Sequence, residues 1–182
     1  MKIISAPNKV LNTKSENIKN IDRNIKKIIS EMAKCLESQK DPQGVGLAAP
    51  QVGLNLRLFI MKPLTDSKHQ ALINPKILSF FDKKQTKTSK KTVKSKLEGC
   101  LSIPRIWSPI KRRYGVNIEY TDFNGNIMKK TFTGYQAIIV QHEIDHLDGI
   151  LFTQRALEQK SQLIEEKGEK LQLNFLVISE GP

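Results

Sequence analysis

The sequence predicts an α+β fold in which a buried central helix is surrounded by mainly antiparallel β-sheets, with a further helix near each end of the chain. Three observations support this prediction. Residues 137–147 are apolar on nearly every side of a helix, which is typical of a buried helix. Strand-like segments lie on both sides of that helix along the chain. Residues 22–38 carry one apolar stripe at helical spacing, which indicates a second helix with a single apolar face.

The N-terminal helix is expected to run from Asp22, which can cap its first turn, to about Ser38. Cys35 lies beside the apolar stripe, and we interpret it as a small residue of the core or its boundary. The stripe consists of Ile25, Ile28, Ile29, Met32 and Leu36.

Three strands are expected before the middle of the chain. Residues 56–61 form the first. Residues 71–74 form the second, which Pro75 should end because proline cannot donate to a strand ladder. Residues 76–81 form the third.

An antiparallel hairpin is expected next. Apolar and polar residues alternate over 116–120, an Asn-Gly turn follows at 124–125, and residues 127–132 form the return strand. Gly134 then opens the central helix, and Gly149 is placed to end it.

The C-terminal part should contain an exposed, charged helix over residues 155–171 and a short strand over 174–178. Length favours a single domain, residues 1–182, because 182 residues are enough for a hydrophobic core. A lysine-rich stretch, residues 83–96, should form a solvated basic loop within it.

Charge and cysteine content narrow the setting in which this chain works. The formal net charge of +12 suits a polyanionic neighbour such as RNA. Two cysteines do not make a disulfide framework, which favours a reducing compartment. The sequence shows neither a signal peptide nor an apolar run of roughly 20 residues. We therefore expect a cytoplasmic protein without a membrane segment.

The central helix carries the motif Gln-His-Glu-Ile-Asp-His at residues 141–146. His142 and His146 are four residues apart, so they lie on one face of a helix and can bind one metal ion. Glu143 can then reach a water molecule on that ion. A buried helix whose histidines find ordinary hydrogen-bond partners is the simpler alternative.

A catalytic metal site needs a third protein ligand, and several residues are candidates. Phe152 stands where one class of zinc peptidases has its third histidine, which excludes that class. Glu165 and Glu166 have the spacing of the thermolysin-like peptidases, although they lie in a segment that resembles a solvated helix face. His69 lies in a polar loop, and Cys100 follows a glycine in a compact apolar segment.

Three segments together resemble peptide deformylase in sequence, order and spacing. They are Gly-Val-Gly-Leu-Ala-Ala-Pro-Gln at 44–51, Glu-Gly-Cys-Leu-Ser at 98–102 and the helix motif at 141–146. The resemblance extends over about residues 5–155. It implies a metal-dependent hydrolase that removes the formyl group from the N-terminal formyl-methionine of new polypeptides.

The resemblance also implies a role for each site residue. Iron(II) is the expected metal, with zinc, nickel or cobalt as substitutes, and Glu143 is the expected general base and acid. Gln51 and the backbone N–H of Leu101 would form the oxyanion hole, and Gly46 belongs to the catalytic loop. Glu98 would support the site through an ion pair whose partner the sequence does not name. The implied metal ligands are Cys100, His142 and His146.

The implied pocket for the methionine side chain contains one departure from the family, because many bacterial members carry arginine where this chain has Trp107. The expected partners are formyl-methionyl nascent chains and the ribosome, and the expected assembly is a monomer. Two alternatives stay open: a thermolysin-like peptidase that uses Glu166, and a non-catalytic RNA- or ribosome-binding module. The expected pocket residues are Val45, Trp107, Tyr135, Ile138 and Ile139.

Overall fold

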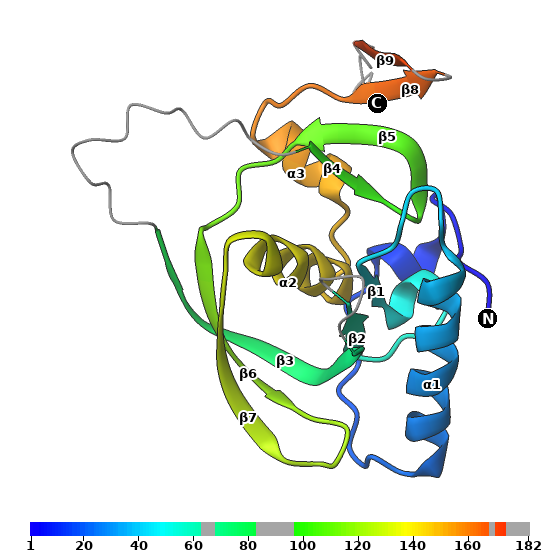
Figure 1. Cartoon of the computed structure of the whole chain (residues 1–182), viewed down its shortest axis with the longest axis vertical. Helices are drawn as coiled ribbons and strands as arrows, with labels where there is room; N and C mark the ends of the chain where they lie inside the picture. The colour runs from blue at the N-terminus through cyan, green and yellow to red at the C-terminus, as the bar shows by residue number, and fades with distance from the viewer. Residues whose placement is uncertain (63–67, 83–96, 168–169, 174–182) are drawn as a thin grey trace.

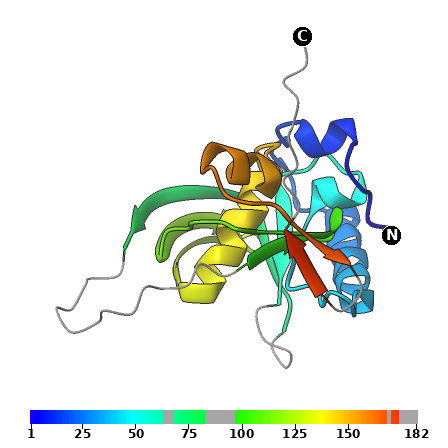
Figure 2. The ribbon, with the colours of Figure 1, turned by 90° about the horizontal axis from the view of Figure 1, so that it is seen from above.

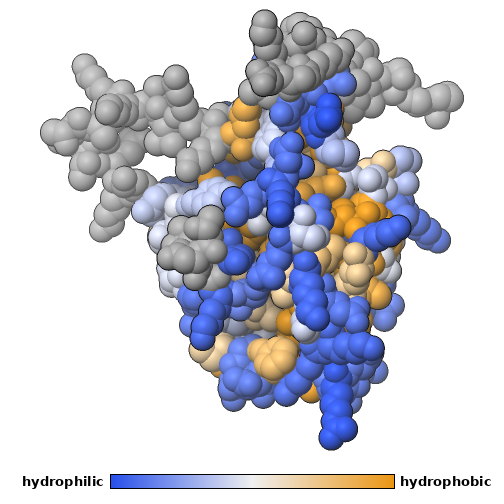
Figure 3. Space-filling model, turned by 45° about the vertical axis from the view of Figure 1, so that its right-hand side comes forward, coloured by the Kyte–Doolittle hydropathy of each residue, from blue (hydrophilic) through white to orange (hydrophobic). Residues whose placement is uncertain are grey.

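The computed structural model describes residues 1–62, 68–82, 97–167 and 170–173. The lysine-rich stretch at 83–96 and the strand predicted at 174–178 lie outside the described residues. Within the described residues, no helix has the length and hydropathy needed to cross a membrane. Hydrophilic residues cover much of the face shown in Figure 3, and hydrophobic patches lie between them.

The larger sheet has five antiparallel strands in the order β1-β2-β3-β6-β7. The predicted hairpin is confirmed as β6 and β7, which pair from Gly115 opposite Thr133 to Thr121 opposite Ile127. The strands are β1 (Gly46–Ala48), β2 (Leu58–Met61), β3 (Gln70–Phe81), β6 (Gly115–Thr121) and β7 (Ile127–Thr133).

Two helices cover opposite faces of this sheet at β1 and β2 (Figures 1 and 2). Successive side chains of a strand point to opposite faces. Phe59 and Met61 therefore pack with residues of α2 (Gly134–Leu147), whereas Leu58 and Ile60 pack with residues of α1 (Arg23–Ser38). Because both faces are covered, β2 is buried along its whole length.

The predicted N-terminal helix is confirmed as α1, and Asp22 is its N-cap. The Asp22 carboxylate accepts a hydrogen bond of 2.8 Å from the backbone N–H of Ile25. Cys35 is buried in the core that α1 shares with the sheet, as predicted. Two short 3-10 helices flank this region, η1 (Lys9–Asn12) and η2 (Ala49–Val52).

The smaller sheet has four antiparallel strands in the order β4-β5-β8-β9 and lies on the side of α2 away from the larger sheet (Figure 1). A short helix, α3 (Phe152–Glu158), packs against β4 and β5. The strands are β4 (Leu97–Cys100), β5 (Ile103–Pro109), β8 (Ile164–Lys167) and β9 (Lys170–Leu173).

The prediction that Pro75 separates two strands is wrong, because β3 continues through it. The register of β3 against β6 shifts between Ile73 and Lys76, and Asn74 has a φ of 50°. Pro75 falls within this bulge, where its missing N–H removes no ladder hydrogen bond. At this bulge the Asn74 side chain accepts a hydrogen bond from the backbone N–H of Ile18 and donates one to its C=O, at 2.8 Å each.

The prediction of a charged helix over 155–171 is also wrong. Helix α3 ends at Glu158, and Lys160 has a φ of 52°, which a helix does not allow. Residues 164–167 form β8 instead, and its first two residues, Ile164 and Glu165, pair with β5. The lysine and glutamate residues of this segment favour a helix only weakly, and pairing with an available strand outweighs that preference.

Candidate active site

Helix α2 brings three motif residues into the interior. It begins at Gly134, which has a φ of 57°, and the chain leaves it at Gly149, which has a φ of 74°. His146 and Glu143 are buried, and His142 is nearly so. The centroids of the two imidazole rings lie 4.9 Å apart, as expected for positions i and i+4 on one helix face.

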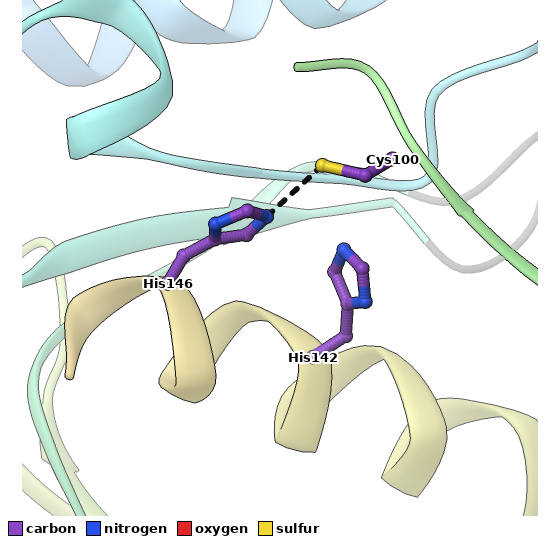
Figure 4. Close-up of side chains that lie close together, drawn as sticks. All are labelled: Cys100, His142 and His146. Atoms are coloured by element: carbon purple, nitrogen blue, oxygen red, sulfur yellow. Dashed lines mark hydrogen bonds between the residues drawn. The ribbon is translucent and has the colours of Figure 1, made fainter. Parts of the chain in front are cut away.

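Cys100 reaches these histidines from the smaller sheet. It ends β4 at a shift in the register between β4 and β5, and its side chain points toward α2 (Figure 4). Its Sγ lies 3.1 Å from Nε2 of His146. Single donor atoms of Cys100, His142 and His146 all lie within 4.8 Å of one another, so the three residues could hold one metal ion.

The chemistry of this cluster fits a metal ion. Burial alone would raise the pKa of the Cys100 thiol, but the neighbouring His146 and His142 hold that pKa well below its usual value. The cysteine is thereby favoured as thiolate, the form that binds metals. Among the described residues, Nδ1 of His146 and Oε2 of Glu143 are buried without a hydrogen-bond partner. A water molecule beside a bound metal ion would give Oε2 of Glu143 a partner, whereas Nδ1 of His146 lies across its ring from Nε2, the nitrogen that faces Cys100.

Glu143 lies against Gly46, the first residue of β1 in the glycine-rich segment. A Cβ added at Gly46 would lie only 2.8 Å from Cδ of Glu143, so the carboxylate occupies the space that glycine leaves. Burial raises the pKa of Glu143 to about 7, although His142 and His146 oppose this rise. A carboxyl group that titrates near neutral pH can both accept and return a proton.

Gln51 lies beside Cys100, and its amide is held in one orientation. Its Oε1 accepts a hydrogen bond of 2.8 Å from the Ala48 backbone N–H. Its Nε2 therefore points the other way and donates to Sγ of Cys100 at 3.4 Å. Leu101 follows Cys100 in the turn between β4 and β5. The structure thus brings a side-chain donor and this turn to the same cluster.

Sequence reasoning missed the partner of Glu98, which is Arg112. The guanidinium donates to both carboxylate oxygens of Glu98, at 2.9 and 3.0 Å, and also to Asp145. Glu98 contacts Nδ1 of His142 at 3.1 Å on its other side. Burial alone would raise the pKa of Glu98. Hydrogen bonds from His142 and Arg112 lower it by more, so the pKa lies below its usual value. The only sequence signal was an arginine pair with no distinguishing pattern.

The cluster opens into a cavity of about 230 Å³. Tyr135 and Ile138 reach it from one face of α2, and Trp107 reaches it from β5. All five residues predicted for the methionine pocket line this cavity. It is bordered by the predicted pocket residues Val45, Trp107, Tyr135, Ile138 and Ile139, together with Gly46, Gln51, Cys100, Leu101, His142 and Glu143.

The other candidate ligands lie elsewhere. Glu166 is on β8 and accepts a hydrogen bond of 3.0 Å from Nε1 of Trp107. Nδ1 of His69 lies 3.6 Å from a carboxylate oxygen of Glu37, at the end of α1. Neither residue belongs to the group that could hold a metal ion among the described parts of the chain.

Comparison with known proteins gives a consistent result. The family model for polypeptide deformylase matches residues 1–162. A peptide deformylase of Finegoldia magna is 36% identical over 162 residues, which are 89% of this chain and 90% of that protein. The chloroplastic/mitochondrial peptide deformylase 1B of Arabidopsis thaliana is 33% identical over 178 residues, covering 96% of this chain and 61% of that one.

Solved structures agree with the sequence matches. The crystal structure of peptide deformylase from Thermotoga maritima superposes with a TM-score of 0.72 at 33% identity, covering 84% of this chain and 95% of that one. A peptide deformylase from Synechococcus elongatus in complex with actinonin superposes with a TM-score of 0.73 at 32% identity, covering 84% of this chain and 76% of that one.

Proposed function

Because this chain belongs to the polypeptide deformylase family, we propose that its activity is carried by Cys100, His142 and His146 as metal ligands and by Glu143 as the acid–base residue. The reaction is hydrolysis of the formyl group from the N-terminal formyl-methionine of new polypeptides. The observation that carries the proposal is that Cys100, His142 and His146 form one cluster that could hold a metal ion, and that Cys100, His142 and Glu143 line one cavity.

We propose iron(II) as the metal, with zinc, nickel or cobalt as substitutes. One thiolate and two imidazoles form a donor set that suits several of these ions. The chemistry that such an ion supplies when bound is polarisation of a carbonyl oxygen and a lowered pKa of water. Glu98 supports one ligand, because its contact with Nδ1 of His142 leaves Nε2 as the nitrogen that can face Cys100.

The residues around the cluster transfer the proton and stabilise the developing negative charge. Glu143 takes the proton of the attacking water and returns it to the leaving amine, a role that its pKa near 7 suits. The side-chain amide of Gln51 and the backbone N–H of Leu101 donate to the formyl oxygen as it becomes anionic. Loss of one such donor typically costs about 100- to 1000-fold in rate. Gly46 leaves room for the Glu143 carboxylate in its working position.

The pocket residues fit an unbranched apolar side chain. Val45, Ile138 and Ile139 supply aliphatic walls, while Trp107 and Tyr135 supply aromatic ones. Such a pocket holds methionine through burial of apolar surface, which contributes about 25 cal/mol per Å² removed from water. The side chain then places the formyl carbon at the cluster.

We further propose that residues 1–182 act as one catalytic domain and as a monomer. Its substrate emerges from ribosomes, which supports a location in the cytoplasm or in an organelle derived from it. The net charge of +12 supports a contact with ribosomal RNA. Binding of the protein to ribosomal RNA should then weaken steeply as salt is added.

The direct test is formate release from formyl-Met-Ala-Ser by protein purified without oxygen and supplied with iron(II). The matched control is Glu143→Ala, which keeps all three proposed metal ligands. We expect formate from the wild type and a rate at least about 100-fold lower from the variant. Equal rates from both proteins would remove Glu143 from the mechanism, and no formate from metal-loaded wild type would refute the assigned activity.

A further inference from the structure

Trp107, which lines the substrate cavity, is tied to the C-terminal hairpin β8–β9. In the pairing of β5 with β8, Trp107 lies opposite Ile164, and Ile106 lies opposite Glu165. Glu166 is therefore the diagonal neighbour of Trp107 on the same face of the sheet, within reach of long side chains. Its Oε2 accepts a hydrogen bond of 3.0 Å from the indole Nε1.

The other side of the indole rests on β4. Gly99 lies opposite Trp107 in the β4–β5 pair. A Cβ added at Gly99 would lie 2.7 Å from both Cε3 and Cζ3 of the indole, so the ring covers the glycine backbone closely. The six-membered ring is thus fixed by Gly99, and the N–H edge is fixed by Glu166. Two contacts at different edges leave a planar ring little freedom to turn.

The indole is also a wall of the cavity that contains Cys100 and Glu143, whereas Glu166 does not line that cavity. Glu166 therefore has no direct access to a side chain bound there. It can affect a substrate only through the position of Trp107. A turn of the ring away from β4 would widen the cavity on the side of Leu97 and Gly99, which also line it.

We propose that Glu166 is a positioning residue that holds Trp107 against Gly99 and thereby sets the width of the substrate pocket. The C-terminal hairpin then acts in selectivity: it favours the slender methionine side chain over wider ones. This inference rests on the proposed function, because it assigns the cavity to the N-terminal side chain of a formylated polypeptide.

The first test is spectroscopic and does not need activity. Trp107 is the only tryptophan of the chain, so its indole gives one N–H signal in a ¹H–¹⁵N spectrum and all of the indole fluorescence. Glu166→Ala should shift the indole N–H signal and make the fluorescence easier to quench with acrylamide. Glu166→Gln, which keeps an acceptor oxygen, should leave both closer to the wild type.

The matched control is Glu165→Ala, which removes the same charge one residue away, on the opposite face of the strand. It should leave the indole signal unchanged. If Glu166→Ala does not fold, Glu166→Met replaces it, because methionine keeps the side-chain length and lacks the carboxylate acceptor. An indole signal that is the same with and without the Glu166 carboxylate would overturn the proposal.

The second test measures kcat/KM for formyl-Met-Ala-Ser and for formyl-Phe-Ala-Ser. The value of kcat/KM for the methionine substrate divided by that for the phenylalanine substrate should fall at least about tenfold in Glu166→Ala, the lower end of what loss of one hydrogen bond to a charged group gives. In a Trp107→Phe background the same change should have no further effect, because phenylalanine has no N–H to hold. A purely structural role of Glu166 would lower both values of kcat/KM together and leave their ratio unchanged.

The two tests separate this proposal from the proposed function. If the wild type releases no formate, the function fails, and the indole signal still decides whether Glu166 holds the ring. If formate is released and the indole signal changes while the ratio does not, the function stands and the positioning role is refuted.

Discussion

Gly46→Ala should remove most of the activity without replacing any proposed ligand or acid–base residue. The added Cβ would lie 2.8 Å from Cδ and 3.0 Å from Cγ of Glu143. Non-bonded carbon atoms ordinarily stay at about 3.5–4.0 Å, so the carboxylate must retreat by roughly 0.5–1 Å. Misplacement of a reacting group by about 1 Å can cost about 100-fold in rate. We therefore expect kcat/KM to fall at least about 100-fold, toward the limit of about 10⁴ for losing the acid–base group altogether.

The assay is formate release from formyl-Met-Ala-Ser, with metal content measured on the same samples. Metal content should not change, because Cys100, His142 and His146 are untouched. The matched background is Glu143→Asp, whose shorter side chain leaves room for the new methyl group. Gly46→Ala should cost clearly less in that background than in the wild type, since two residues in contact are not additive. Activity of Gly46→Ala within about threefold of the wild type would show that the carboxylate is not needed where the structure has it.

Two further changes test the ligand set and its supports, and a third tests the turn between β6 and β7. Cys100→Ser should strongly reduce bound metal per chain, measured by elemental analysis; retention of metal would favour a different third ligand. Arg112→Ala leaves the carboxylates of Glu98 and Asp145 buried without this cation, and should lower the free energy of unfolding by about 3–5 kcal/mol in urea titrations. A loss below about 1 kcal/mol would contradict this. Hydrogen bonds from the following turn hold the pKa of Asp122 below its usual value. Its stabilising effect is therefore full above the unfolded pKa and is lost as the pH falls through the lower folded value. The difference in melting temperature between wild type and Asp122→Ala should shrink in acid, and a constant difference would refute this assignment.

The elements that could be predicted are those whose signal is local. Asp22 caps α1 through a bond to a residue three positions away, and the hairpin of β6 and β7 follows from alternation and an Asn-Gly turn. The wrong predictions concern pairings between distant residues. Pro75 ends no strand, because the bulge depends on Asn74 reaching Ile18, 56 residues earlier. Residues 164–167 form a strand because β5, almost 60 residues earlier, offers an edge.

The candidate site shows the same division. Motif spacing indicated two ligands on one helix face, and resemblance to a family supplied the third ligand and the pocket residues. The structure then brings the three candidate ligands into one cluster, and the predicted pocket residues line the cavity beside it. Arg112 and the bond between Trp107 and Glu166 left no pattern in the sequence. In a sequence, an arginine that neutralises buried carboxylates cannot be told from a surface arginine until its partners are known. In the same way, a glutamate that holds an indole looks like any solvated glutamate.

Arg112 explains how a charged motif can lie inside the protein. Asp145, between the two histidines, is only 7% exposed, and an unpaired carboxylate there would be very costly. Arg112 and Arg155 both donate to it, and Arg112 also holds Glu98 against His142. The same guanidinium therefore permits the burial of α2 and supports the orientation of one proposed ligand. Its loss should weaken metal binding together with folding, although it touches none of the proposed ligands.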